Sequence, residues 1–199
     1  MSKYFKSCGS EFWTLDDKKH REDGPAVITE TSREWWINGL RHREDGPAIE
    51  MYNGSKLWYK NGLHHREDGP AVELSNGLKE WWVNGKRRRL DGPAYSFGFM
   101  KEWWIKDKLH RKDGPAVESL IRKEWRFEGM RHRDDGPAVL NCNLKNDDVK
   151  GWWLFDKNCY TEEEYQEQKN KYREGVESIL YDDIKICRDL SRYVSSFVI

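Results

Sequence analysis

The chain has 199 residues, which suits one domain or one repeat array with an appendage, and its 35 basic and 35 acidic side chains cancel to zero net charge. Neutrality argues against a dedicated nucleic-acid binder, and 11 tryptophans argue against a disordered chain. The four cysteines lack the spacing of a zinc site or a disulfide framework, and no signal peptide or membrane-spanning stretch is evident. We expect a soluble, intracellular protein with reduced thiols.

The tetrapeptide Asp-Gly-Pro-Ala occurs six times and organises the sequence. Its copies begin 22 or 23 residues apart, at Asp23, Asp45, Asp68, Asp91, Asp113 and Asp135. Self-similarity at a fixed period indicates one small structural unit copied in tandem. Such arrays build extended surfaces more often than a single catalytic pocket, which favours binding and scaffolding over catalysis.

Residues 1–11 are expected to be an N-terminal leader, and residues 12–160 to hold the tandem units. In the stretch that begins at the third tetrapeptide, Asp68, residues 71–74 predict a short strand, Ser75-Asn76-Gly77 a hairpin turn, residues 79–83 an aromatic strand, and Asn84-Gly85 a second turn. The predicted fold class is therefore mainly β: an elongated, twisted antiparallel sheet of tandem β-hairpins with a C-terminal α-helical cap. One hairpin cannot bury its own apolar face, so neighbouring units must stack.

An aromatic pair recurs once in each unit. The pairs are Phe12-Trp13, Trp35-Trp36, Trp58-Tyr59, Trp81-Trp82, Trp103-Trp104, Trp125-Arg126 and Trp152-Trp153, with arginine replacing the second aromatic residue in the sixth. Adjacent strand residues point to opposite faces, so either both faces are covered or one face carries a stripe of aromatics. Core packing, a binding face for a partner helix or peptide, and a stacking platform for sugars or single-stranded bases all stay open.

A basic segment precedes each tetrapeptide. Its first position holds His20, His42, His65, Arg88, His110 and His132, and the next position always holds arginine. A row of metal sites is disfavoured, because the arginine would repel a cation and each unit offers only one His–Asp pair. We expect the Asp to accept hydrogen bonds in the Gly-Pro turn, and the Arg to pair with an acid or stack on a Trp. No nucleophile recurs with them, so we expect no catalytic residue, metal or cofactor.

The sequence departs from the repeat pattern after the sixth tetrapeptide. An inserted loop is predicted from Asn141 to Asp148, and Thr161-Glu162-Glu163-Glu164 reads as a helix capping box. Residues 161–199 predict one long or two shorter helices, with Gly175 a possible break. Their apolar face would cap the open sheet end or contact a second subunit. The residues expected to mediate self-association are Tyr172, Val176, Ile179, Leu180, Leu190, Val194 and Phe197.

The unit resembles the MORN repeat in a divergent form, with Glu-Trp-Trp-x-Asn-Gly followed by His-Arg-x-Asp-Gly-Pro-Ala. This string is similar to tandem repeats in proteins of large DNA viruses and phages, and the resemblance covers about residues 12–160. It implies protein–protein interaction, assembly or membrane-proximal scaffolding without enzyme activity. For a viral protein, it also implies a location in the host cytoplasm or the virion.

The leading hypothesis is a non-enzymatic scaffold that binds an unidentified protein partner and forms a homodimer. Its candidate binding face comprises Trp36, Trp58, Trp82, Trp104, Trp153, Arg43, Arg66, Arg89, Arg111 and Arg133. One alternative is a sequesterer of nucleotides, glycans or single strands along this Trp/Arg stripe. Another is a membrane-surface scaffold, although the only obvious basic cluster is Lys86 to Arg89.

Overall fold

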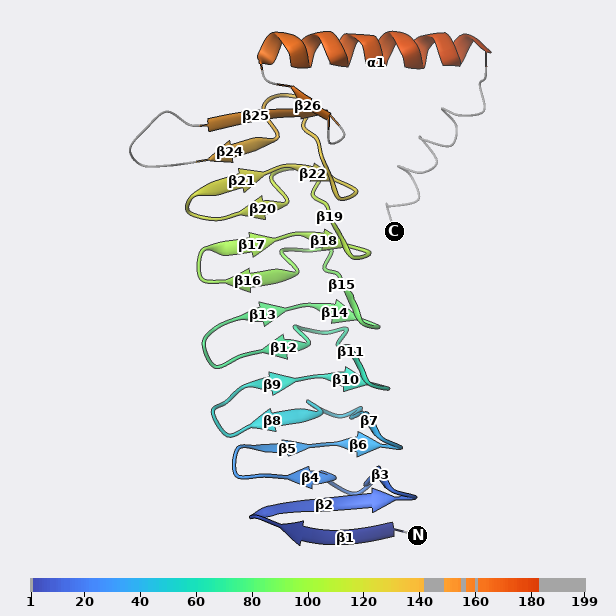
Figure 1. Ribbon diagram of the computed structural model, residues 1–199, viewed down its shortest axis with the longest axis vertical. Coiled ribbons are helices and arrows are strands. Elements are labelled where there is room, and N and C mark those ends of the chain that lie inside the picture. The colour runs from blue at the N-terminus through green and yellow to red at the C-terminus, as the bar shows by residue number, and fades with distance from the viewer. Residues whose placement is uncertain (1, 142–148, 155–156, 160, 183–199) are drawn as a thin grey trace.

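The computed structural model describes residues 2–141, 149–154, 157–159 and 161–182. It has a tall, twisted antiparallel sheet of 16 strands, with one helix across the end formed by the last units (Figure 1). The predicted mainly β fold class of tandem hairpins is confirmed. The sheet follows the order β1 (Ser2–Ser7), β2 (Ser10–Leu15), β4 (Val27–Ile28), β5 (Ser32–Glu34), β8 (Ile49–Met51), β9 (Lys56–Leu57), β12 (Val72–Glu73), β13 (Lys79–Glu80), β16 (Tyr95–Phe97), β17 (Met100–Glu102), β20 (Val117–Glu118), β21 (Arg122–Glu124), β24 (Val139–Asn141), β25 (Val149–Leu154) and β26 (Lys157–Cys159), and β3 (Lys18–Lys19) pairs with β2.

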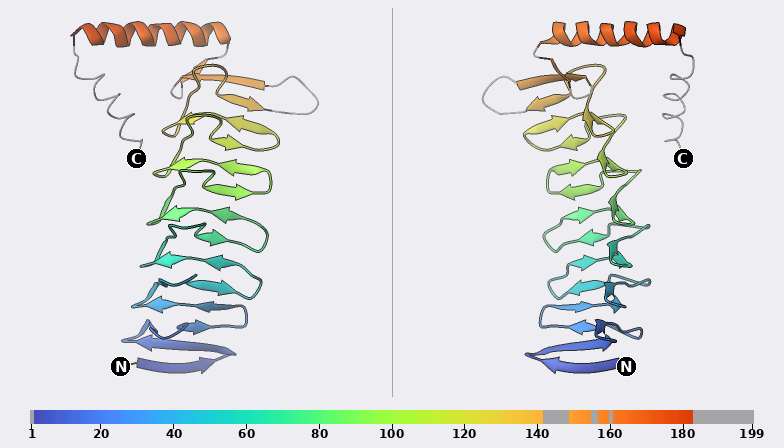
Figure 2. Two further views of the ribbon diagram at one scale, coloured as in Figure 1. Left: turned by 180° about the vertical axis from the view of Figure 1, so that it is seen from behind. Right: turned by 45° about the vertical axis from the view of Figure 1, so that its right-hand side comes forward.

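A column of small hairpins runs beside the main sheet (Figure 2). The sequence patterns did not predict this second column. Each hairpin arises where the aromatic strand leaves the main sheet, turns and pairs with itself. Asn38 and Gly39 show the cause, because their φ angles of 51° and 82° suit the tight turn that joins two short antiparallel strands. The five hairpins are β6 (Trp36–Ile37) with β7 (Leu40–Arg41), β10 (Tyr59–Lys60) with β11 (Leu63–His64), β14 (Trp82–Val83) with β15 (Lys86–Arg87), β18 (Trp104–Ile105) with β19 (Lys108–Leu109), and β22 (Arg126–Phe127) with β23 (Met130–Arg131).

The core is a line of small residues along the array. The alanine of every tetrapeptide is fully buried, and the residue after it is buried in several copies. Each alanine carbonyl accepts a hydrogen bond from the backbone of the first tryptophan of a pair, as Ala48 does from Trp35 at 2.8 Å. The alanines that share this arrangement are Ala26, Ala48, Ala71, Ala94, Ala116 and Ala138. Each tetrapeptide is thereby fastened to the aromatic strand before it.

The N-terminal end of the sheet begins earlier than the sequence indicated. The segment expected to be a leader forms β1 and the start of β2, which pair along their length from Ser2↔Leu15 to Ser7↔Ser10. The aromatic pair of the first copy is offset by one residue, because the backbone of Trp13 bonds to Ala26 as that of Trp35 bonds to Ala48. Trp13 therefore corresponds to Trp35, and Thr14 corresponds to Trp36.

At the other end, helix α1 (Glu162–Asp182) crosses the sheet and contacts β25 and β26 (Figure 1). The backbone of Glu164 donates to Thr161 Oγ1 at 3.1 Å, which is the hydrogen bond expected of the predicted capping box. The helix continues through Gly175, so no break occurs there. Tyr165 is fully buried and its hydroxyl donates to the carbonyl of Arg133, which fixes the helix over the last units.

The self-association predicted for the C-terminal segment is not resolved by these contacts. The backbone positions 172, 176, 179 and 180 lie in α1, whereas residues 190, 194 and 197 lie outside the described part of the chain. Contact with a second subunit stays a prediction. Across the described residues, α1 is the one helix, and it lacks an apolar stretch of the kind that crosses a membrane.

Candidate functional site

The arginine before each tetrapeptide is enclosed by its own unit. The guanidinium carbon of Arg66 lies 4.0 Å from the centre of the Trp58 ring, and its Nε donates to Asp68 Oδ1 at 2.9 Å. Its Nη1 donates to the carbonyl of Pro70 at 3.2 Å. The ion pair and the aromatic stacking, predicted as alternatives, are thus both present. The other stacked pairs are Arg21–Trp13, Arg43–Trp35, Arg89–Trp81, Arg111–Trp103 and Arg133–Trp125.

The candidate binding face consequently divides into two rows. The inner row contains the stacked arginines Arg43, Arg66, Arg89, Arg111 and Arg133 with the first aromatic residue of each pair, and Trp58 belongs to it. The outer row contains Trp36, Tyr59, Trp82, Trp104 and Arg126, each on the first strand of a small hairpin. The backbone of Trp153 lies in β25, and its side chain is outside the described part of the chain. The structure therefore does not place the predicted residues in one continuous stripe.

The outer row is bound together by carboxylates and cations. The Nε1 atoms of Trp36, Trp82 and Trp104 donate to the glutamate two positions earlier, at 2.9, 2.7 and 2.8 Å. The guanidinium of Arg87 lies 4.8 Å from the ring centre of Trp82 and 5.1 Å from that of Trp104. Arg87 also pairs with Glu80 at 2.9 Å and with Glu102 at 3.6 Å. These aromatic rings thus have partners within the array.

Copies are numbered here by their aromatic pairs, and the third copy, with Trp58-Tyr59, replaces all members of this charged arrangement. Leu57, Tyr59 and His64 stand where the second copy has Glu34, Trp36 and Arg41. The rings of Tyr59 and His64 are 4.0 Å apart, and burial lowers the pKa of His64 from its usual value. Because Leu57 replaces the carboxylate of Glu34, no cation is required at the position of Arg41, and the neutral imidazole of His64 suits it.

The repeated histidines join neighbouring units. His20 Nδ1 accepts a hydrogen bond from the backbone of Asn38 at 3.1 Å, and His42 accepts one from Asn61 at 3.2 Å. The same bond links His65 to Asn84 and His110 to Glu128. Across the described residues, no group of three His, Cys, Asp or Glu side chains is placed to hold a metal ion. The geometry therefore assigns these histidines to the junctions between units.

Sequence reasoning missed a patch of exposed apolar side chains on two adjacent hairpin turns, which we call the tip patch. Its members are Phe97, Phe99, Met100, Leu120 and Ile121, and Phe99, Leu120 and Ile121 are 72%, 66% and 68% exposed. The turns are neighbours because β17 pairs with β20, and both lie on the side of the sheet away from the small hairpins (Figure 2). The available signal was an apolar residue at turn positions where other copies are polar: Leu120 and Ile121 replace Glu30 and Thr31.

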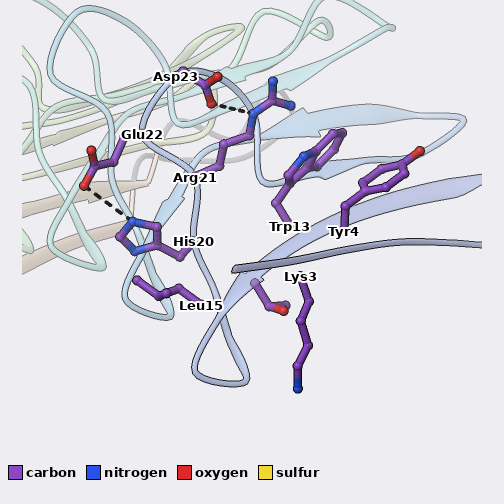
Figure 3. A pocket seen from close by; sticks show the side chains of 9 residues that line it. Lys3, Tyr4, Trp13, Leu15, His20, Arg21, Glu22 and Asp23 are labelled. Carbon is purple, nitrogen blue, oxygen red and sulfur yellow. Dashed lines mark hydrogen bonds and ion pairs between the residues drawn. The ribbon is translucent and has the colours of Figure 1, made fainter. Parts of the chain in front are cut away.

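A pocket of about 560 Å³ lies at the N-terminal end of the array, between β1, β2 and the first basic segment. Tyr4 and Trp13 form an aromatic wall, with ring centres 4.9 Å apart (Figure 3). In the second unit, the backbone of Arg21, from the preceding basic segment, bonds to Trp36. The corresponding residue of the first unit is Thr14, which has β1 beside it instead, and the pocket lies at this place. The charges of Lys3 and Arg21 are paired with Asp17 and Asp23, so the pocket has no evident preference for a charged ligand.

Comparison of the sequence with protein-family models and with curated proteins gave no match. The resemblance to MORN repeats accordingly stays a prediction, and the fold and the contacts described above are the basis for the functional argument.

Proposed function

We propose that this chain is a non-enzymatic scaffold that binds a partner protein through the tip patch. The observation that carries the proposal is the gathering of large, exposed apolar side chains on two adjacent turns. Several large apolar side chains exposed on neighbouring turns are unusual in a free soluble protein and are typical of an interaction site. Exposed Lys101 and Lys123 lie on the strands that lead from these turns, which gives an apolar centre with a polar rim.

The distribution of polar groups also supports binding over catalysis. The recurring Arg, Asp and His side chains make the same intramolecular contacts in copy after copy, as the Arg66–Trp58 and His42–Asn61 pairs illustrate. A catalytic site requires a unique arrangement of reactive groups that differs from the rest of the array. The same contacts weigh against the alternative of a Trp/Arg stripe for nucleotides, glycans or single strands, because the arginines already stack on the inner tryptophans.

The test compares the natural chain with a variant in which the sixth turn takes the residues of the second, Leu120→Glu with Ile121→Thr. The two turns have the same geometry, since Thr29 and Ser119 each donate a backbone hydrogen bond three residues ahead, at 2.9 and 2.8 Å. The variant should therefore fold. Leu90→Glu is the matched control, because Leu90 is 65% exposed on a different segment where other copies carry charge.

Tagged forms of the three proteins are recovered from cells that make them, with and without nuclease, and co-purified proteins are identified by mass spectrometry. The proposal predicts a discrete protein that survives nuclease, binds the natural chain and the Leu90→Glu control, and is lost from the turn variant. Equal recovery with the turn variant would overturn the tip patch as the binding surface. Recovery only in the absence of nuclease would favour nucleic acid instead, and recovery of the chain alone would favour self-assembly.

A further inference from the structure

The sixth copy departs from the others in the chemistry of its outer row. Arg126 occupies the place of Trp36, Trp82 and Trp104, and Arg122 occupies the place of Ser32. Both side chains point to the same face as Glu124, because residues two apart on a strand share a face. A third arginine, Arg131, joins them from the paired strand β23. These three arginines and Glu124 are called the arginine cluster below.

All three arginines in the cluster converge on the single carboxylate of Glu124. Arg122 Nη2 lies 2.6 Å from Oε2, and Arg126 Nη2 and Arg131 Nε lie 2.5 and 2.9 Å from Oε1. The Glu124 side chain is only 6% exposed, whereas that of Arg122 is 42% exposed. The carboxylate is therefore enclosed, and Arg122 is the most accessible arginine of the cluster, since the side chains of Arg126 and Arg131 are 20% and 29% exposed.

Among the residues that the structure describes, Arg122 and Arg126 share the single carboxylate of Glu124, which leaves a formal charge of +1 before Arg131 is counted. In the second copy, by contrast, Arg41 and Glu34 balance one to one, at 3.5 Å. Charge of one sign in a partly desolvated site is costly unless an opposite charge approaches it. A ligand that carries negative charge would balance this excess.

We propose that the arginine cluster binds an oxyanion, such as a phosphate group or a carboxylate, on the open side of Glu124. Guanidinium groups suit this ligand because their planar fork presents two N–H donors to two oxygens at once. Ligand oxygens bind chiefly the exposed guanidinium of Arg122, because the Nε and Nη1 of Arg126 already donate to Glu124 and to the carbonyl of Gly129. Glu124 holds both guanidiniums in place. The proposal is independent of the tip patch, since it concerns different side chains and a different ligand.

The array itself supplies the variants for the test. Arg126→Trp restores the residue of the fourth copy, where Trp82 lies between Glu80 and Arg87, and Arg122→Ser restores the residue of the second copy. The matched control is Arg41→Leu, which removes one positive charge at the position that corresponds to Arg131 and introduces the residue that the fifth copy carries as Leu109. All three changes place a side chain in a position where the array already tolerates it.

Binding of inorganic phosphate, sulfate and acetate is measured by calorimetry at constant ionic strength, with chloride as the reference anion. The natural chain and Arg41→Leu should show saturable binding, and its affinity should fall by about tenfold or more in the Arg122→Ser, Arg126→Trp double variant. Preference for phosphate and sulfate over acetate would indicate a phosphate-type ligand, and the reverse a carboxylate. In the natural chain, phosphate should also shift the NMR signals of the Arg122 and Arg126 Nε–H groups. Absence of saturable binding by the natural chain, or equal affinity in the double variant, would overturn the proposal.

Discussion

A Cβ atom added to Gly69 would lie 2.7 Å from the guanidinium carbon of Arg66. The glycine backbone thus forms one wall of a slot for this guanidinium, and the Trp58 ring, 4.0 Å away, forms another. Asp68 and the carbonyl of Pro70 bind its N–H groups. The string Arg-x-Asp-Gly-Pro therefore recurs because each residue supplies a different side of one arginine site.

Gly69→Ala is predicted to destabilise the array, because its new methyl group must displace a guanidinium that is held by stacking and hydrogen bonds. The expected loss is about 1–3 kcal/mol of unfolding free energy, which is typical of overpacking. Denaturant unfolding of Gly69→Ala, Arg66→Ala and the double variant measures it as a cycle. The alanine at position 69 should cost little once Arg66 is absent. A cost that is the same in both backgrounds would show that the backbone, rather than the arginine, requires glycine here.

Arg66→Lys is predicted to destabilise the chain although it conserves charge. Lysine lacks the planar group that stacks on Trp58 and binds Asp68 and Pro70 together, and the expected loss is roughly 1–2 kcal/mol. The same measurement on Arg33→Lys supplies the control, because Arg33 is exposed on a strand of the main sheet. Equal effects of the two substitutions would contradict a specific role for the guanidinium.

The tandem hairpins, the helical cap and the local role of the arginines could be predicted from sequence, because they follow from period, turn residues and charge pairing. The division of the aromatics into two rows could not. Trp35 and Trp36 are chemically identical, and what separates them is that Arg43 folds back onto Trp35 while Trp36 enters a small hairpin. The one-residue offset of the first aromatic pair could not be predicted for the same reason, since Phe12-Trp13 resembles the other aromatic pairs in sequence.

The tip patch and the arginine cluster escaped prediction because they are departures from the repeat. The residues that all copies share are those that build the array, such as Arg66 and Asp68. Sites that distinguish one unit from its neighbours appear only when each position is compared across the copies, as with Leu120 against Glu30 or Arg126 against Trp82. Repetition therefore predicts the scaffold, and its exceptions indicate candidate sites.

The stability of the array is predicted to fall as the pH drops below about 6.5. Burial lowers the pKa of His64 and of His110 below their usual 6.5. A group with a lowered folded-state pKa takes up its proton more readily in the unfolded chain, so acid favours unfolding. Its contribution is complete above the unfolded-state pKa and is lost as the pH falls toward the folded-state value.

Denaturant unfolding at about pH 7.5 and about pH 5.5 checks this dependence, since histidine titrates in that range. His64→Leu, which introduces the residue found at Leu109 in the fifth copy, should reduce the difference between the two conditions. An unchanged difference would mean that His64 does not titrate on unfolding. Stability that rises on acidification would contradict the sign of the prediction.

Glu124→Gln is predicted to be among the most destabilising single substitutions of a polar residue in the array, because it removes the only negative charge of the arginine cluster. Breaking a buried ion pair costs about 3–5 kcal/mol, and partial exposure of the arginines reduces the expected loss here to about 2–3 kcal/mol. Glu34→Gln provides the comparison, since Glu34 pairs with one arginine, Arg41, at 3.5 Å. Combining Glu124→Gln with Arg126→Trp should recover part of the loss, because one uncompensated cation is then absent. Suppose that Glu124→Gln lowers the unfolding free energy no more than Glu34→Gln does. The convergence of three arginines on one carboxylate would then not contribute to stability, because solvent would screen the excess charge.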